Sequence, residues 1–135
     1  MLFNTKSVLA LMSLALFAAC GSANMTGYYT GSTSGTVNNQ SQPLAMTMTV
    51  SQKGSTISGD WCLTLSNTSS NCGTLSGGSF DGTTLSGLTL VAPPGQTCAG
   101  NLTAAATQSG STLTGTITGT NNCGAASASL QITKQ

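Results

Sequence analysis

The chain has 135 residues, which is the usual size of one domain, and its only charged side chains are three lysines and two aspartates. It contains no histidine. Nucleic-acid binding needs clustered basic side chains, and acid–base catalysis needs groups that titrate near neutral pH. We therefore expect no enzyme, no catalytic residues and no nucleic-acid partner.

Residues 1–19 have the features of a signal peptide. Lys6 supplies a positive amino-terminal region, residues 8–17 are mostly apolar, and Ala18 and Ala19 are the small residues that a signal peptidase accepts. A transmembrane anchor is the alternative. A membrane span needs about 20 apolar residues, whereas this run has roughly a dozen, so the sequence favours export.

Residues 17–22, FAACGS, resemble the lipobox of bacterial lipoproteins, whose cysteine is acylated with fatty acids such as palmitate and becomes the new N-terminus. The resemblance implies that Cys20 is the lipid attachment site and that residues 20–24 form a short lipidated linker. It also implies that the lipid holds the protein at the membrane, in the cell envelope of a bacterium. By the same resemblance, Gly21, the residue directly after this cysteine, implies sorting to the outer membrane, because it is not an aspartate. Cleavage nearby, for instance after Ala23, is the alternative, and it would discard Cys20.

From residue 25 onwards, the chain alternates apolar residues with serine and threonine. This period of two predicts strands that bury one face, and no run of good helix formers interrupts it. The predicted strands cover residues 25–31, 44–52, 55–65, 72–80, 83–91, 97–107, 111–119 and 123–134.

A repeat of 28 residues organises these strands. The hexapeptides GSTISG, GTTLSG and GSTLTG begin at Gly54, Gly82 and Gly110, and TGYYTG at 26–31 lies one repeat earlier. Each unit fits two strands with their connections, so four units predict eight strands. Closing a meander removes both exposed edges. We therefore expect an all-β fold, an eight-stranded antiparallel up-and-down barrel over residues 25–135.

The two glycines of each hexapeptide have different predicted roles. The first allows positive φ in a hairpin turn. The last, which is Gly59, Gly87 or Gly115, falls inside a strand, where a missing side chain permits a bend or close packing. The dipeptide Asp81–Gly82 also predicts a type I′ turn, in which both central residues have positive φ.

Apart from Cys20, the cysteines form an even set suited to two disulfides in an oxidising compartment: Cys62, Cys72, Cys98 and Cys123. The nearest two have nine residues between them and the chain has no histidine, so we expect no metal site. A C-x-x-C redox motif is also absent, and nothing in the sequence indicates a cofactor.

The predicted hairpins also assign the cysteine pairs. A hairpin centred near Asn67 places Cys62 opposite Cys72. The register of the later hairpin brings Cys98 close to Cys123. We therefore predict the disulfides 62–72 and 98–123.

The alternation places a set of large side chains inside the barrel. An eight-stranded barrel is either filled by its own side chains or holds one small ligand. Tyr29 and Trp61 could line such a ligand pocket, or they are simply part of the core. Leu88 and Leu90 face inward only if the alternation changes phase near Gly87. The other predicted interior residues are Met46, Met48, Val50, Ile57, Leu63, Leu65, Leu75, Leu85, Leu102, Leu113, Ile117, Leu130 and Ile132.

Gly27, Tyr28 and Tyr29 open the first strand in a way that is similar to the avidin-like and lipocalin-like (calycin) barrels, which also begin with glycine followed closely by an aromatic residue. The whole chain also resembles small Thr/Gly-rich bacterial lipoproteins. The first resemblance implies a barrel layout, and the second implies a lipid-anchored protein.

Two functions fit these features. The first is a non-enzymatic interaction or structural module, anchored by lipid, with an envelope protein or a glycan as its partner. The alternative is a carrier of a small apolar ligand inside the barrel.

The repeat also predicts which end of the barrel binds a partner. Because each unit spans two strands, the tight turns at 52–55, 80–83 and 108–111 should share the rim nearest Cys20 and face the membrane. The longer connections should share the other rim. Their uncharged Asn, Gln, Ser and Thr side chains would bind a partner there, or serve only as soluble connections.

Lipidation is tested directly at Cys20. Because acylation requires the thiol, Cys20→Ala should leave an unprocessed precursor that incorporates no labelled palmitate. Globomycin, which blocks cleavage, should also leave an uncleaved precursor, whereas Ser22→Ala should be processed normally. Immunoblotting and metabolic labelling measure both. Unchanged processing of Cys20→Ala to a soluble product contradicts the assignment.

Overall fold

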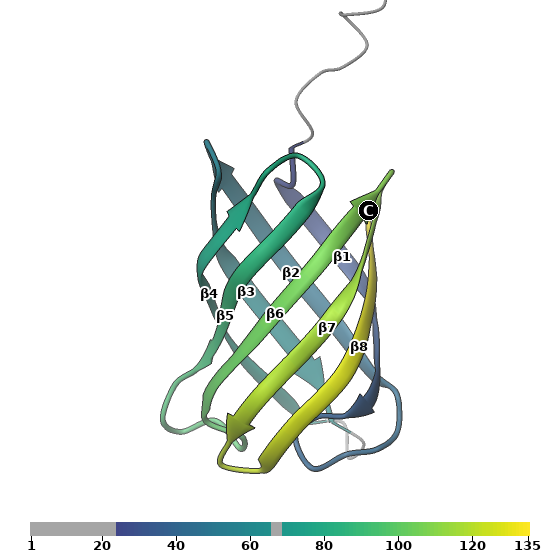
Figure 1. Cartoon of the computed structure of the whole chain (residues 1–135). Coiled ribbons are helices and arrows are strands. Elements are labelled where there is room, and N and C mark those ends of the chain that lie inside the picture. The colour runs from purple at the N-terminus through teal and green to yellow at the C-terminus, as the bar shows by residue number, and fades with distance from the viewer. Residues whose placement is uncertain (1–23, 66–68) are drawn as a thin grey trace, which may run out of the picture.

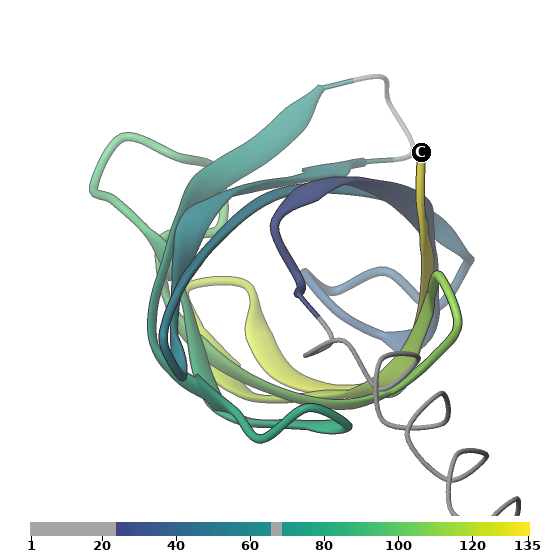
Figure 2. The same cartoon turned by 90° about the horizontal axis from the view of Figure 1, so that it is seen from above.

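The computed structural model describes residues 24–65 and 69–135, and it shows a closed antiparallel barrel. Each strand pairs with the next one along the chain, and β8 pairs with β1, so the strands form a ring when viewed along the axis (Figures 1 and 2). The strands are β1 (Gly27–Thr36), β2 (Leu44–Lys53), β3 (Thr56–Thr64), β4 (Ser70–Phe80), β5 (Thr84–Ala92), β6 (Gly100–Ser109), β7 (Thr112–Asn121) and β8 (Gly124–Lys134). The predicted fold class is confirmed. The predicted signal peptide and Cys20 lie outside the described residues.

The two rims of the barrel carry different connections, as predicted. The short β2–β3, β4–β5 and β6–β7 turns lie at one end, together with the start of β1 and the C-terminus (Figure 1). We call this end the tight-turn rim. The opposite end, the long-loop rim, carries the β1–β2, β3–β4, β5–β6 and β7–β8 connections.

Most strand limits lie within two residues of the prediction, and the two that differ by more are both at the long-loop rim. β1 continues to Thr36 instead of ending at residue 31, because its polar second half pairs with β8 after its pairing with β2 has ended at Thr33. β6 begins at Gly100 instead of residue 97. The residues before it form part of the connection at that rim.

The barrel core contains every residue that the alternation placed inside. All of these side chains are buried, including Tyr29, Trp61, Leu88 and Leu90. The core also contains residues that the prediction missed: Met25, Val37, Leu44, Phe80, Ala92, Cys98, Ala104, Ala106, Ala126 and Ala128. Inward alanines are easily missed because they carry little hydrophobic signal.

Met25 closes the tight-turn rim from inside. Its side chain is completely buried, its backbone N–H donates to Gln52 Oε1 at 2.8 Å, and its carbonyl accepts the Tyr29 hydroxyl at 2.8 Å. The chain therefore enters the barrel across this rim and is held there by both of its backbone polar groups.

The hexapeptide glycines have the two predicted roles, with one exception. Gly54, Gly82 and Gly110 have φ of 60°, 103° and 60° in the tight turns. A Cβ at Gly59 or Gly115 would collide with a carbonyl oxygen of the neighbouring strand, on Thr49 and Ala105 respectively. Close approach of adjacent backbones therefore requires glycine at these two positions.

Gly87 is the exception, because it bends the chain instead of packing closely. Its φ is 62°, a Cβ there would meet little, and the register between β5 and β6 shifts between Leu85 and Leu88. This bulge explains how Leu85, Leu88 and Leu90 all face the interior. The predicted phase change near Gly87 is confirmed.

The predicted type I′ turn at Asp81–Gly82 is wrong, because Asp81 does not have positive φ. Instead, Asp81 Oδ1 accepts the backbone N–H groups of Thr83 at 2.9 Å and Thr84 at 2.7 Å. These hydrogen bonds hold the pKa of the Asp81 carboxyl below its ordinary value, and the bond from Thr84 has the larger effect. The Asp81 side chain therefore stabilises the turn by binding two of its backbone N–H groups, and a second residue with left-handed φ is not needed.

A turn with positive φ at both central residues occurs in the β1–β2 connection. Asn38 and Asn39 have φ of 53° and 60°, and Val37 and Gln40 exchange two backbone hydrogen bonds of 3.1 and 2.9 Å around them. Asparagine tolerates left-handed φ better than other residues with side chains. This small hairpin turns Val37 and Asn38 toward the barrel interior, where both are buried.

The third hexapeptide offers a test of the two glycine roles. Gly115→Ala should lower the free energy of unfolding by about 3 kcal/mol, because the clash is with backbone that cannot rotate away. Gly110→Ala should cost about 1 kcal/mol, because only its left-handed φ opposes a side chain. Urea unfolding of both variants measures the difference. Equal losses would contradict the assignment of separate roles.

Candidate functional site

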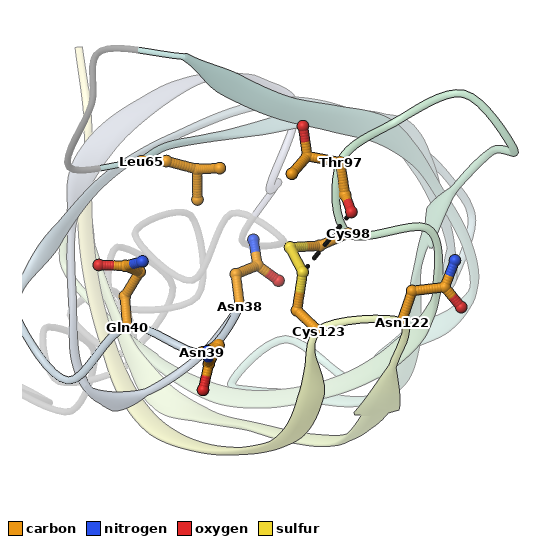
Figure 3. Close-up of a pocket in the computed structure, with 8 residues that line it drawn as sticks. All are labelled: Asn38, Asn39, Gln40, Leu65, Thr97, Cys98, Asn122 and Cys123. Atoms are coloured by element: carbon orange, nitrogen blue, oxygen red, sulfur yellow. Dashed lines mark hydrogen bonds between the residues drawn. A yellow bond between two sulfur atoms is a disulfide. The ribbon is translucent and has the colours of Figure 1, made fainter.

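An open depression of about 410 Å³ lies at the long-loop rim, over the mouth of the barrel (Figure 3). It is lined by residues 38–40 from the β1–β2 connection, Thr97 and Cys98 from the β5–β6 connection, Asn122 and Cys123 from the β7–β8 connection, and Leu65 at the end of β3. We call it the mouth depression. Three connections that are distant in the sequence meet around it.

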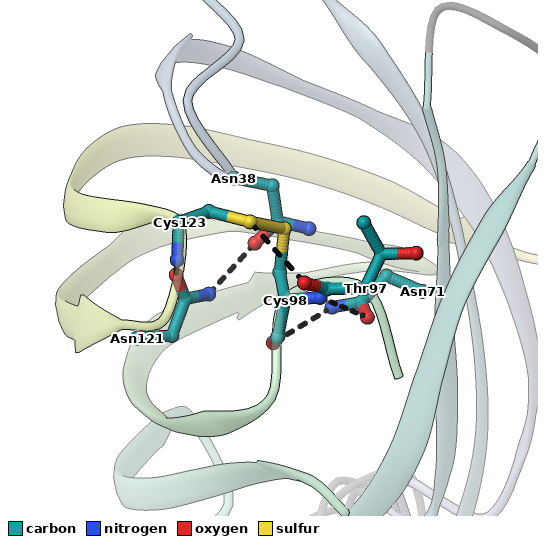
Figure 4. The surroundings of a disulfide bond; sticks show 6 residues. All are labelled: Asn38, Asn71, Thr97, Cys98, Asn121 and Cys123. Atoms are coloured by element: carbon teal, nitrogen blue, oxygen red, sulfur yellow. Dashed lines mark hydrogen bonds between the residues drawn. A yellow bond between two sulfur atoms is a disulfide. The ribbon is translucent and has the colours of Figure 1, made fainter. Parts of the chain in front are cut away.

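The β5–β6 connection, residues 93–99, is held in the mouth by side-chain amides. The Asn71 amide is completely buried on β4; its Nδ2 donates to the Cys98 carbonyl at 3.2 Å and its Oδ1 accepts the Cys98 N–H at 3.1 Å (Figure 4). Gln96 Oε1 accepts the N–H of Cys72 at 2.8 Å. Two amide side chains thus replace the hydrogen bonds that a further strand pairing would supply.

A second set of amides joins the other two connections. The Cys123 N–H donates to Asn121 Oδ1 at 2.9 Å, and Asn121 Nδ2 donates to Asn38 Oδ1 at 2.8 Å (Figure 4). Asn38 is only 4% exposed, and its Nδ2 has no hydrogen-bond partner. The mouth therefore holds one buried amide donor group that the protein leaves unpaired.

Both predicted disulfides are present. Cys62 and Cys72 face each other across β3 and β4, with Cα atoms 4.1 Å apart. Cys98 and Cys123, with Cα atoms 5.2 Å apart, tie the β5–β6 connection to the β7–β8 hairpin (Figure 4). The first bond reinforces the barrel wall, whereas the second crosses the mouth and lines the depression.

Trp61 and Tyr29, the residues considered for an internal ligand pocket, lie in the core. The cross-strand register places Met48 between them, opposite each one. Trp61 Nε1 donates to the Thr74 carbonyl at 3.1 Å, and the Tyr29 hydroxyl is bound to the Met25 carbonyl. Burial raises the pKa of the Tyr29 phenol. Their polar atoms are thus satisfied by backbone groups, and neither side chain lines the mouth depression.

The four charged side chains within the described residues lie away from the mouth. Lys53, Asp81 and Lys134 are at the tight-turn rim, and Asp60 is exposed on the outer face of β3. Within residues 24–65 and 69–135, no group of His, Cys, Asp and Glu side chains could hold a metal ion. The same residues contain no helix able to span a membrane.

Two other depressions are weaker candidates. One lies on the tight-turn rim beside Gln108 and Lys134, and the other lies along the outer side of residues 91–96. Gln108 also has a buried oxygen without a partner, but its residue is partly exposed. The mouth depression combines a nearly fully buried, unpaired polar group with fixed neighbours.

No protein-family model, curated protein or solved structure matches the chain significantly. The site must therefore be interpreted from its own chemistry. Sequence reasoning missed the roles of Asn38, Asn71 and Asn121. The adjacent pair Asn38–Asn39 carried a usable signal, since such a pair favours a left-handed turn. The other two asparagines gave none, because Asn71 binds Cys98 in another connection and Asn121 binds Asn38, 83 residues away.

The brace at Asn71 is testable by a matched pair of variants. Asn71→Ala should lower the free energy of unfolding by about 3 kcal/mol, because it leaves two buried backbone groups of Cys98 unpaired. Asn101→Ala, at an exposed position on β6, should change it by less than about 0.5 kcal/mol. Urea unfolding and hydrogen exchange at the Cys98 amide measure both. Unchanged protection of that amide in Asn71→Ala contradicts the bracing role.

Proposed function

We propose that this protein is a lipid-anchored module of the bacterial cell envelope that binds a partner, without catalysis, through its long-loop rim. The observation that carries the proposal is the difference between the two ends of the barrel. The tight-turn rim receives the N-terminal segment, whereas the long-loop rim presents a braced, uncharged polar depression.

The short N-terminal linker supports this orientation. Cys20 precedes Met25 by five residues, which span at most about 18 Å when fully extended. Met25 is fixed at the tight-turn rim. A lipid on Cys20 would hold that rim near the membrane surface and direct the mouth depression away from it, toward the space where an envelope partner is found.

The chemistry of the rim supports binding over catalysis. The side chains at the mouth are amides, a hydroxyl, a leucine and a disulfide, none of which titrates near neutral pH. Rigidly held loops on a barrel are a common place for binding sites. Asn71, Asn121 and the Cys98–Cys123 disulfide hold these loops in place.

The buried positions of Trp61 and Tyr29 favour this function over a carrier of an apolar ligand. A ligand in the barrel would have to displace inward side chains whose polar atoms are already bound to the backbone. We therefore propose the rim, and not the interior, as the working part of the molecule.

Photo-crosslinking in cells that produce the full chain tests the proposed face. A diazirine amino acid at Asn122, which is exposed at the mouth, should capture an envelope protein or glycan. The same amino acid at Ser111, which is exposed on the tight-turn rim, is the matched control and should not capture that partner. Gel shifts and mass spectrometry of the adducts measure this.

Two results would contradict the proposal. Capture of the partner from Ser111 and not from Asn122 would place the binding face at the tight-turn rim. A small apolar molecule retained in native mass spectra, and released by Trp61→Phe, would support the carrier instead.

A further inference from the structure

The Asn38 side chain is held in one orientation by the amides around it. A backbone N–H can only donate, so the Cys123 N–H fixes Asn121 with its Oδ1 toward Cys123. Asn121 Nδ2 then faces Asn38 and must donate to Asn38 Oδ1. Flipping either amide would bring two donors or two acceptors together. Both N–H bonds of Asn38 Nδ2 are therefore left for another acceptor.

The residue that carries this donor lines the mouth depression. Figure 3 shows the Asn38 side chain between Leu65 and the Cys98–Cys123 disulfide, and residues on every side of it line the depression. Asn38 is 4% exposed, yet its Nδ2 has no hydrogen-bond partner. Buried polar groups are almost always paired, so an unpaired one at the base of an open depression indicates a place for a ligand oxygen.

The surrounding groups define the chemistry of that ligand. No charged side chain lines the depression among residues 24–65 and 69–135, so neither an anion nor a cation would be selected. Asn39, Thr97 and Asn122 are exposed there and offer further neutral donors and acceptors. Leu65 and the disulfide add apolar contact. This mixture suits a small, neutral molecule that carries several hydroxyl groups on an apolar ring.

Shape favours a saccharide over a peptide. One common way for an extended peptide to bind is to add a strand to a sheet edge, and the closed barrel has no free edge among its eight strands. The depression is bounded by three connections, and its volume of about 410 Å³ is within the range of about 300–1,000 Å³ for small-ligand sites. A saccharide unit fits such a bowl better than an extended chain does.

We propose that the mouth depression is a binding site for a neutral saccharide, with Asn38 Nδ2 donating a hydrogen bond to one of its oxygen atoms. The proposal deepens the proposed function and rests on it, because it gives the long-loop rim a ligand class. The saccharide could be free or could be the end of an envelope glycan, since both present the same hydroxyl groups.

The test is a titration of the ¹⁵N-labelled full chain in detergent micelles with free neutral sugars. The probes are glucose, galactose, mannose, N-acetylglucosamine and their disaccharides, together with a capped alanine tripeptide. At least one saccharide should give saturable shifts of the Asn38 side-chain amide and the Asn122 and Cys123 backbone amides. Glucuronic acid, which adds a negative charge, should bind more weakly than its neutral counterpart.

Asn38→Gly removes the donor while keeping a residue that accepts left-handed φ, so the turn should survive. It should weaken binding of the same saccharide about tenfold or more, the effect of losing one hydrogen bond. Asn24→Gly makes the same change at the exposed tight-turn rim and should leave the affinity unchanged. Immobilised envelope glycan chains tested in parallel distinguish a free sugar from a glycan end.

Several results would overturn the proposal. These are the absence of shifts with every saccharide at tens of millimolar, binding that survives Asn38→Gly, shifts confined to the tight-turn rim, or shifts at Asn38 with the peptide alone. Crosslinking from Asn122 to an envelope protein, combined with no saccharide binding, would refute this inference and leave the proposed function standing.

Discussion

Closure of the sheet by the pairing of β8 with β1 is the constraint on which the other features depend. Eight strands with no free edge fix the circumference, so the interior must be filled by the residues that the alternation turns inward. Closure also brings neighbouring backbones close together. Gly31, Gly59 and Gly115 occupy the same position of the 28-residue repeat, and at each of them a Cβ would collide with a carbonyl of the adjacent strand. These glycines of the repeat are thus explained by the close approach of adjacent strands in the barrel.

The two ends of the closed barrel are sealed by different physical means. At the tight-turn rim an apolar plug, Met25, fills the end, and short turns complete it. At the long-loop rim, backbone groups are bound by the side-chain amides of Asn71, Gln96 and Asn121, and Asn121 also donates to Asn38. Each donor in a chain of amides needs an acceptor, so the first hydrogen bond sets the orientation of all the others. Here the chain runs from the Cys123 N–H through Asn121 to Asn38 Oδ1, and Asn38 Nδ2 is left unpaired beside the depression.

Much of the fold follows from short-range regularities that are visible in the sequence. Period-two alternation placed the eight strands and seventeen of the inward residues, and the 28-residue spacing placed the tight turns at one rim. Both disulfide pairs followed from hairpin register, which is a local property. The turn at Asp81 was misassigned because a side-chain oxygen, and not a second residue with positive φ, satisfies its backbone.

The sequence by itself determined the strand pattern, the pairing of consecutive strands and the cysteine pairs, because each depends on residues within about one repeat of one another. Tertiary structure alone decided the composition of the mouth. Asn38 and Asn121 are 83 residues apart, and Asn71 on β4 binds Cys98 in the β5–β6 connection, where no strand pairing predicts a contact. These amide contacts nevertheless organise the rim. Such contacts depend on where a closed barrel brings its connections together. The sequence does not distinguish an asparagine whose amide is hydrated from one whose amide binds a distant backbone group.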